Sequence, residues 1–470
     1  MKKNLMSAKI WVAPILVYLF FLLITCGAAS LETTQKGSFL SGLLVSLAGS
    51  HDLVAHLLAG TALFAAYLGM LLLAKDQNGT PVWLASLLAL TIPAAVYSQT
   101  YGSLNGALSV APAAALTLFY LVLAEKVLGA KHKKARYALP LFVLGVAAQF
   151  FHVSLSIGIC ILSFAMTVKY WKRGSWVLLL HSLSAWAGCV VALLFSEKIP
   201  WVSTTNLLCR AEALVDGILA KNWPMLLLLT TACLLLIQPL RADRSKRCSQ
   251  ILQELLLPVA VFALCPYLKP VALIAAALKL LFAVVYLRGL WQTVKIYVNR
   301  EHRRHQIQRL LAASGAFVLP LLLVGERNDG LFYLPCLLMA AATLLLWSYA
   351  LHHFGNLERF CRKLMPAVGI TVLCCCVWIA VCNNMTDGVR REYSRHQESA
   401  GATEICLPEY PFAEYRAEEA VDFTTLTVEF CPWEEWDWSG YYANLRSSDS
   451  DEGTDEEKTN NMPSFKDEEE

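Results

Sequence analysis

The chain has 470 residues, of which 57% are hydrophobic and 16% charged, with a mean hydropathy of +0.50. This composition is too apolar and too poor in charge for a soluble enzyme, and it predicts a polytopic membrane protein. The basic residues lie in short clusters between apolar runs, which is typical of membrane topology. A nucleic-acid-binding protein would need a basic stripe on a folded surface, so nucleic acid is not an expected partner.

The amino-terminal segment sets the predicted orientation. Three lysines within the first nine residues precede a mostly apolar run over residues 10–29, and a polar loop over 30–52 follows. Lysines before an apolar run of bilayer length hold the amino terminus in the cytoplasm, so the loop faces outward. A cleaved signal peptide is the alternative, because residues 26–30 are small. The run exceeds a usual signal core, so we expect a retained helix.

Apolar runs along residues 1–383 predict an all-α transmembrane bundle of about thirteen helices. Several runs are shorter than about twenty residues, which suits a bundle with cavities or broken helices. The predicted spans are 10–29, 52–74, 82–97, 105–125, 137–151, 153–169, 175–195, 223–240, 251–265, 268–288, 308–324, 331–350 and 364–383.

The distribution of basic residues supports this threading. With the amino terminus inside, the inner segments hold 25 Lys and Arg and the outer loops hold 6, as the positive-inside rule requires. The least certain spans are 137–151 and 153–169, for which one long helix is the alternative. Gln149 and His152 at the break favour a turn. The inner loop 288–309 is basic with a few apolar residues, and it predicts an interfacial amphipathic helix.

An odd number of crossings places everything beyond residue 383 outside the membrane. This part holds 23 of the 36 acidic residues and 7 of the 39 basic ones. Residues 384–446 predict a small extracytoplasmic α+β domain, and the acidic segment 447–470 lacks the apolar content to fold. Two segments with β-branched and aromatic residues are predicted strands, namely 405–412 and 423–430. A disulfide between Cys406 and Cys431 is an open alternative, because spacing alone does not establish one.

Few sequence features point to chemistry. The chain has no HExxH, GxSxG, P-loop or clustered CxxC motif, so hydrolase, NTPase and zinc-site hypotheses lack support. Glu326 and Arg327 lie between two outer span ends, where an arginine can contact a phosphate with two hydrogen bonds. The alternative is a self-neutralising turn that also includes Asp329.

Two further features have a structural and a functional interpretation. Glu212 and Asp216 are four residues apart in the longest outer loop, which is typical of one face of a solvated amphipathic helix. Lys279 is the only Lys or Arg well inside a predicted span, and ionisable residues there often mark transport sites. A transporter or flippase is therefore the alternative function, and a noncatalytic scaffold is the third.

Several short strings resemble an uncharacterised bacterial family of polytopic proteins related to the GT-C membrane glycosyltransferases. The resemblance covers most of the chain in layout but little of it in motif. Besides the amino-terminal span and its outer loop, it rests on Gly145–His152, Asn206 with Arg210, Gly325–Arg327 before Tyr333–Pro335, and Ile405–Pro408 leading to Tyr441 and Tyr442.

The resemblance implies sugar transfer from a polyprenyl-phosphate donor at the outer face of the cell membrane. Such enzymes use an acidic residue of the first outer loop as base or metal ligand. This loop lacks paired aspartates, so either Asp52 and Glu32 replace the missing acid, or the protein is an inactive relative. We expect Asp52 as base, Glu32 as auxiliary acid, and substrate contacts from Arg327, Arg210, His152 and Glu326. Membrane lipid and a lipid-linked sugar are the expected partners, the glycan acceptor is open, and a divalent metal is an optional cofactor without assigned ligands.

Overall fold

The structure is a computed structural model, and the chain divides into two compact units. The first unit comprises Met1–Met385 with Phe412–Val421, and the second comprises Thr386–Pro411 with Asp422–Glu470. The residues that the structure describes are 2–26, 28, 39–48, 51–75, 82–128, 137–171, 176–195, 207–238, 246–265, 272–323, 329–399, 404–417, 427–436, 438 and 441.

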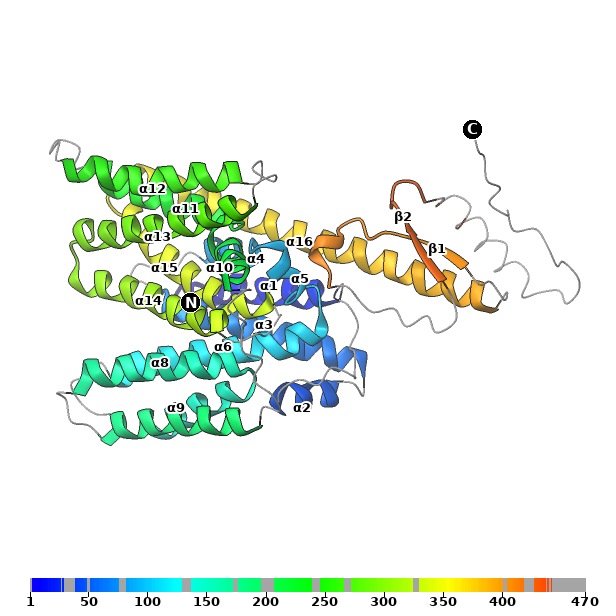
Figure 1. The fold of residues 1–470 in the computed structure, drawn as a ribbon, viewed down its shortest axis with the longest axis horizontal. Coiled ribbons are helices and arrows are strands. Elements are labelled where there is room, and N and C mark those ends of the chain that lie inside the picture. The colour runs from blue at the N-terminus through cyan, green and yellow to red at the C-terminus, as the bar shows by residue number, and fades with distance from the viewer. Residues whose placement is uncertain are drawn as a thin grey trace, which may run out of the picture. The chain divides into compact units, whose positions relative to one another are not determined.

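The first unit is built from helices, many of which run side by side (Figure 1). Long apolar runs form helices because each helix satisfies its own backbone hydrogen bonds, as an apolar environment requires. The α-helices are α1 (Lys2–Thr25), α2 (Phe39–Ala48), α3 (Asp52–Leu73), α4 (Val82–Leu90), α5 (Ala94–Ser98), α6 (Leu104–Leu128), α7 (Ala138–Ala147), α8 (Val153–Tyr170), α9 (Trp176–Phe195), α10 (Leu207–Val215), α11 (Trp223–Ile237), α12 (Lys246–Leu264), α13 (Ala272–Tyr297), α14 (Glu301–Leu323), α15 (Tyr333–Leu351) and α16 (Gly355–Ser399), of which the part up to Met385 belongs to this unit.

Helices occupy all thirteen predicted spans, although the segment 82–97 is two helices. Within the described residues, six helices are long and apolar enough to cross a membrane, and the bent pair α10–α11 would make a seventh. Four more apolar helices are shorter. The break predicted between 137–151 and 153–169 is present, because α7 ends before residues 148–152 and α8 begins at Val153.

Glycines let several helices of the first unit approach closely. A Cβ atom on Gly60 of α3 would lie 2.6 Å from Leu22 of α1, and one on Gly69 would lie 2.7 Å from Leu118 of α6. Gly158 of α8 likewise faces the ring of Phe317 in α14. Small residues at helix crossings are the usual means of close packing between membrane helices. In the middle of the unit, α15 is buried along its span.

The predicted interfacial helix over 288–309 is wrong. Instead, α13 continues to Tyr297, and α14 begins at Glu301 after three non-helical residues. Leu290, Val294 and Val298 are buried, and their spacing of four continues the buried stripe of α13, whereas Trp291 and Ile296 are 42% and 40% exposed. The stretch is the end of one long helix and the start of another, and not a separate helix.

The second unit contains the carboxyl-terminal part of α16 and two short strands. The strands β1 (Glu404–Pro408) and β2 (Thr427–Cys431) pair in parallel, with Ile405 opposite Val428. Strands were predicted at both places and are confirmed, although both are shorter than predicted. Cys406 and Cys431 are free thiols in the structure. Cys406 pairs with Glu429 and Cys431 with Pro408, so the two thiols are diagonal neighbours on the paired strands and lie within hydrogen-bonding range of each other.

Candidate functional site

Four of the six expected site residues have no described side chain. Glu32, Glu326 and Arg327 lie outside the described residues, and Asp52 is described only as the first residue of α3. The proposed base and its auxiliary acid in the first outer loop therefore remain predictions.

Arg210 and His152 are described and lie on different elements. Arg210 of α10 donates a hydrogen bond from Nη1 to the carbonyl oxygen of Leu321, 3.4 Å away in α14. His152 precedes α8, and its Nε2 atom is shielded from solvent without a hydrogen-bond partner among the described residues. Burial lowers the pKa of His152 to about 4, only partly offset by a hydrogen bond to the backbone of Ser109. The ring is therefore neutral near pH 7, and it cannot offer a positive charge to a phosphate.

An ionic cluster that the sequence did not assemble lies between α10 and α13. We call Glu212, Asp216, Lys221 and Lys279 the Lys279 cluster. Lys279 Nζ is 2.7 Å from Glu212 Oε1 and 3.2 Å from Asp216 Oδ1, and Lys221 Nζ is 3.6 Å from Asp216 Oδ2. The side chains of Lys279 and Asp216 are only 13% and 15% exposed, whereas that of Lys221 is 67% exposed. Lys279 is thus the inner cation of the cluster, and its charge is compensated by two carboxylates.

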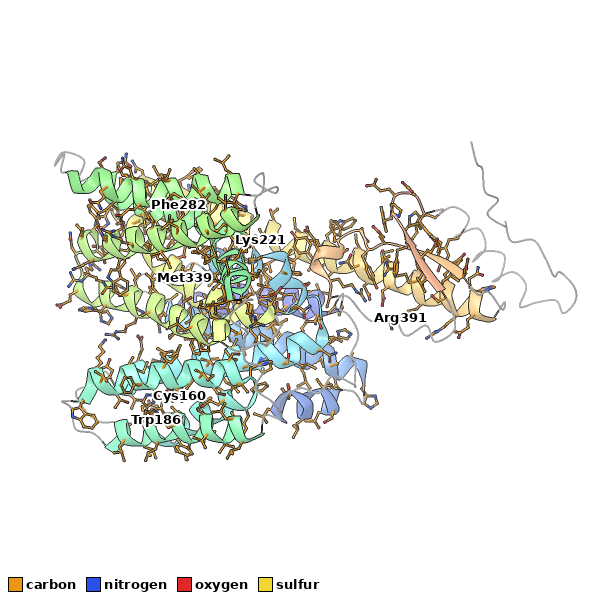
Figure 2. All side chains as sticks on the ribbon, in the orientation of Figure 1. Cys160, Trp186, Lys221, Phe282, Met339 and Arg391 are labelled. Atoms are coloured by element: carbon orange, nitrogen blue, oxygen red, sulfur yellow. The ribbon has the colours of Figure 1, made fainter. Side chains whose placement is uncertain are left out.

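The cluster lies where a helix is interrupted. After α10 the chain forms one π-helical segment, Asp216–Ala220, in which the Lys221 amide donates to the Asp216 carbonyl over 3.1 Å. Pro224 is the second residue of α11 and cannot donate a backbone hydrogen bond, so the helix does not continue unbroken from the preceding segment, and the two helices are bent by 63°. Lys221, labelled in Figure 2, lies at this bend. π-helical segments and interrupted apolar helices are both frequent at functional sites.

Neighbouring groups hold the bend in position. Gly217 packs so closely on Phe332 that a Cβ atom would lie 2.7 Å from the ring, and its carbonyl accepts a hydrogen bond from the Cys336 thiol at 3.4 Å. Asn222 is buried, and its Oδ1 atom has no partner among the described residues. A buried acceptor without a hydrogen bond is energetically unfavourable. A ligand, or a second conformation of the bend, that brought a donor to Asn222 Oδ1 would therefore gain a hydrogen bond.

The charges of the cluster balance, because Lys279 and Lys221 together match Glu212 and Asp216. Protonation of a carboxylate or arrival of another cation would weaken the attraction that holds Lys279. The described residues contain no group of three His, Cys, Asp or Glu that could hold a metal ion. The cluster offers two carboxylates and two ammonium groups that can bind or release protons.

The sequence contained the signal for this cluster in two separate places. In the sequence Lys279 is a lone cation in a predicted span, and Glu212 and Asp216 share one predicted helix face, but nothing in the sequence joins the two features. A lysine in an apolar helix requires a carboxylate partner, and that requirement was the usable clue. The solvated-helix interpretation of Glu212 and Asp216 is wrong, because both carboxylates bind Lys279 and Asp216 is 15% exposed.

Comparisons of the chain with protein-family models, with curated proteins and with solved structures found no match.

Proposed function

We propose that the protein is a multi-pass protein of the cell membrane, with thirteen crossings, a cytoplasmic amino terminus and an extracytoplasmic carboxyl-terminal part. The basic helix ends assigned to the inner side support this, because several meet in the first unit. Gln306 Nε2 donates to the Leu73 carbonyl at 2.9 Å, and Arg303 Nη1 donates to the Lys75 carbonyl at 3.4 Å. Arg309 lies 3.3 Å from Glu125. The contacts bring the ends of α3 and α6 to the start of α14, as the threading requires.

The function proposed for this membrane protein is transport of a charged solute coupled to protons. One observation carries it: a compensated lysine and two carboxylates lie at an interrupted apolar helix. Ionisable residues in such surroundings are costly to bury and usually take part in ion or proton pathways. Interrupted helices expose backbone groups and charges together, which is how many transporters build their binding sites.

The proposed cycle uses the competition for Lys279. A cation that binds Glu212 and Asp216 displaces the ammonium group, and protonation of the carboxylates displaces the cation in turn. Each state differs in the contacts at the bend between α10 and α11, so each ligand has a means of favouring one conformation. The buried Oδ1 atom of Asn222 supplies an additional acceptor for the cation-bound state.

Proton flux in liposomes tests the transport hypothesis. The purified full chain is reconstituted around a pH-sensitive dye, a pH gradient is imposed, and Na⁺, K⁺ or choline is added outside. We expect one of these cations to collapse the gradient, and Glu212→Gln and Asp216→Asn to slow the collapse at least about tenfold, as for loss of a direct ligand. Arg362→Gln is the matched control, because this side chain is 62% exposed and pairs with Glu358 outside the cluster. Absence of proton movement with all three cations would overturn the proposal.

Membrane glycosyl transfer from a polyprenyl-phosphate sugar is the second candidate. The observation that favours it is that Arg210 lies on the same helix as Glu212, so a phosphate-binding group and a carboxylate share one element. Purified protein is incubated with polyprenyl-phosphate sugars, and Asp52→Asn, Glu32→Gln and Glu212→Gln are compared. Transfer of sugar that any of these variants abolishes would favour the enzyme, whereas no transfer and unchanged cell-surface glycans would exclude it.

A further inference from the structure

A second feature of the first unit is a cavity of about 140 Å³ between α3, α6, α8 and α14. Most of its lining is apolar and includes Leu162, Met166 and Ala313. Three charged side chains also line it, namely Glu125, Lys169 and Arg309. The cavity is separate from the Lys279 cluster, and neither candidate function uses it. We call it the Arg309 cavity.

The charges of the Arg309 cavity favour an anion. Arg309 Nη1 lies 3.3 Å from Glu125 Oε1, so the carboxylate orients the guanidinium and leaves one net positive charge from the three groups. The Nε atom of Arg309 is shielded from solvent and has no hydrogen-bond partner among the described residues. Lys169 is exposed, and its Nζ atom lies 5.6 Å from the ring centre of Tyr170. The Arg309 side chain as a whole is 37% exposed, and an arginine and a lysine that line one cavity are suited to a phosphate group.

The position of the cavity adds to this argument. It lies where the start of α14 meets the ends of α3, α6 and α8, and these ends lead into the basic segments of the chain. Such segments mark the cytoplasmic leaflet, where the anionic lipids of a cell membrane attract Lys and Arg. Ala165 lines the cavity and is itself exposed, so the cavity is open at the outer surface of the helices.

We propose that the Arg309 cavity binds one anionic phospholipid, whose phosphate contacts Arg309 and Lys169 and whose first acyl methylenes occupy the apolar part. The volume corresponds to about four or five groups of the size of water, which fits a chain segment and not a whole soluble metabolite. The apolar lining suits an acyl chain, and the net positive charge of the three charged groups suits an acidic lipid headgroup. This proposal rests on the proposed membrane location of the protein but not on its proposed transport activity. The lipid-binding experiment and the proton-flux experiment can therefore give independent results.

Native mass spectrometry of the full chain in detergent tests the proposal. Phosphatidylglycerol, phosphatidylcholine and inorganic phosphate are titrated in turn. We expect phosphatidylglycerol to bind more tightly than the other two, and Arg309→Gln and Lys169→Gln each to weaken it about fivefold, as for loss of one cation near a lipid surface. Arg304→Gln is the matched control, because Arg304 lies on the same helix without lining the cavity.

Two further variants keep the test decisive if Arg309→Gln does not fold. Ala165→Trp fills the cavity from an exposed position and should abolish phosphatidylglycerol binding, whereas Glu125→Gln removes the competing acid and should leave binding at least as tight. Equal binding of phosphatidylcholine would overturn the proposal. So would binding of inorganic phosphate as tight as that of phosphatidylglycerol, or unchanged phosphatidylglycerol binding in Ala165→Trp.

Discussion

The environment of a single lysine carries the main functional argument. Lys279 is in an apolar helix, and an ammonium group there is stable only with nearby carboxylates. Two carboxylates are present within 3.2 Å, on consecutive turns of one helix. The two acids share the buried Lys279, and Asp216 also lies 3.6 Å from the exposed Lys221 ammonium group, so Lys279 competes with any proton or cation that binds the carboxylates.

This sharing gives a first stability prediction. Lys279→Met leaves Glu212 without its cation and Asp216 with only the exposed Lys221 nearby, and it should lower the free energy of unfolding by about 2–4 kcal/mol. Adding Glu212→Gln and Asp216→Asn to Lys279→Met should recover most of that loss, because the only charge left in the cluster is the exposed Lys221. Thermal unfolding in detergent, followed by size-exclusion chromatography, measures both effects. Arg362→Met, at a 62% exposed side chain outside the cluster, is the control and should change little. A triple variant less stable than Lys279→Met would contradict this account.

The second unit has its own buried cation. Arg390 of α16 is 6% exposed, donates from Nε to the Pro408 carbonyl at 2.6 Å, and lies 3.7 Å from the ring centre of Tyr410. Arg390→Ala removes a charged hydrogen bond and a cation–π contact, and should destabilise the unit by about 2–4 kcal/mol. Its neighbour Arg391, labelled in Figure 2, is 52% exposed beside Asp387. Arg391→Ala should therefore cost about 0.5 kcal/mol.

Hydrogen exchange of β1 and β2 measures this difference, because the Pro408 carbonyl connects Arg390 to the end of β1. We expect the amides of both strands to exchange faster in Arg390→Ala and to keep their protection in Arg391→Ala. Equal protection in the two variants would mean that Arg390 does not stabilise the strands.

Cys431 allows a test by pH. Partial burial, and then the neighbouring Cys406 thiol, raise the pKa of Cys431 to about 12. Only the thiolate reacts with an alkylating reagent, so at pH 8 labelling should be at least about a hundredfold slower than for an ordinary thiol. The rate should rise throughout pH 8 to 11. Peptide mass spectrometry follows Cys431 alone, and labelling in denaturant is the control. A plateau near pH 9 would contradict the raised pKa.

At the scale of elements, the sequence predicted most helices and both strands, but not where helices bend. A helix is present at every predicted span, because the local pattern of apolar residues is a strong signal for helix formation. The prediction of an interfacial helix over 288–309 is wrong because it relied on the basic residues of this segment. The buried positions Leu290 and Val294 instead extend the packed face of α13 into it. The π-helical segment Asp216–Ala220 packs against Phe332, which lies more than a hundred residues away, and no local pattern predicts such a contact.

Gly217 offers a test of that packing. Gly217→Ala places a Cβ atom 2.7 Å from the buried Phe332 ring, so the ring or the bend must move, at a cost of about 1–3 kcal/mol. Gly315→Ala is the control in α14, because no atom lies within 4 Å of its added Cβ, and it should stabilise by up to about 1 kcal/mol. Thermal unfolding compares the two variants. If they changed the unfolding temperature alike, close packing at the bend would have no energetic role.

At the scale of the whole molecule, pairing between distant elements is what the sequence could not supply. Glu212 and Lys279 are 67 residues apart, and Glu125 and Arg309 are 184 apart. Each residue was visible in the sequence, but only the packing of helices brings opposite charges together. The same packing groups helix ends, since the Asn299 amide donates to the Tyr349 hydroxyl at 3.1 Å and Arg303 contacts the end of α3.

This grouping of helix ends leads to a prediction of topology. A reporter that is active only in the cytoplasm should give a signal when fused after Lys133, between α6 and α7, because the end of α6 lies with the start of α14. The same reporter fused after Glu470 should be silent, because an odd number of crossings separates the two positions in the proposed threading. Fusion to an enzyme active only outside is the reciprocal control. If both cytoplasmic fusions were active, one crossing between α7 and α16 would be miscounted, and the C-terminal unit would be cytoplasmic.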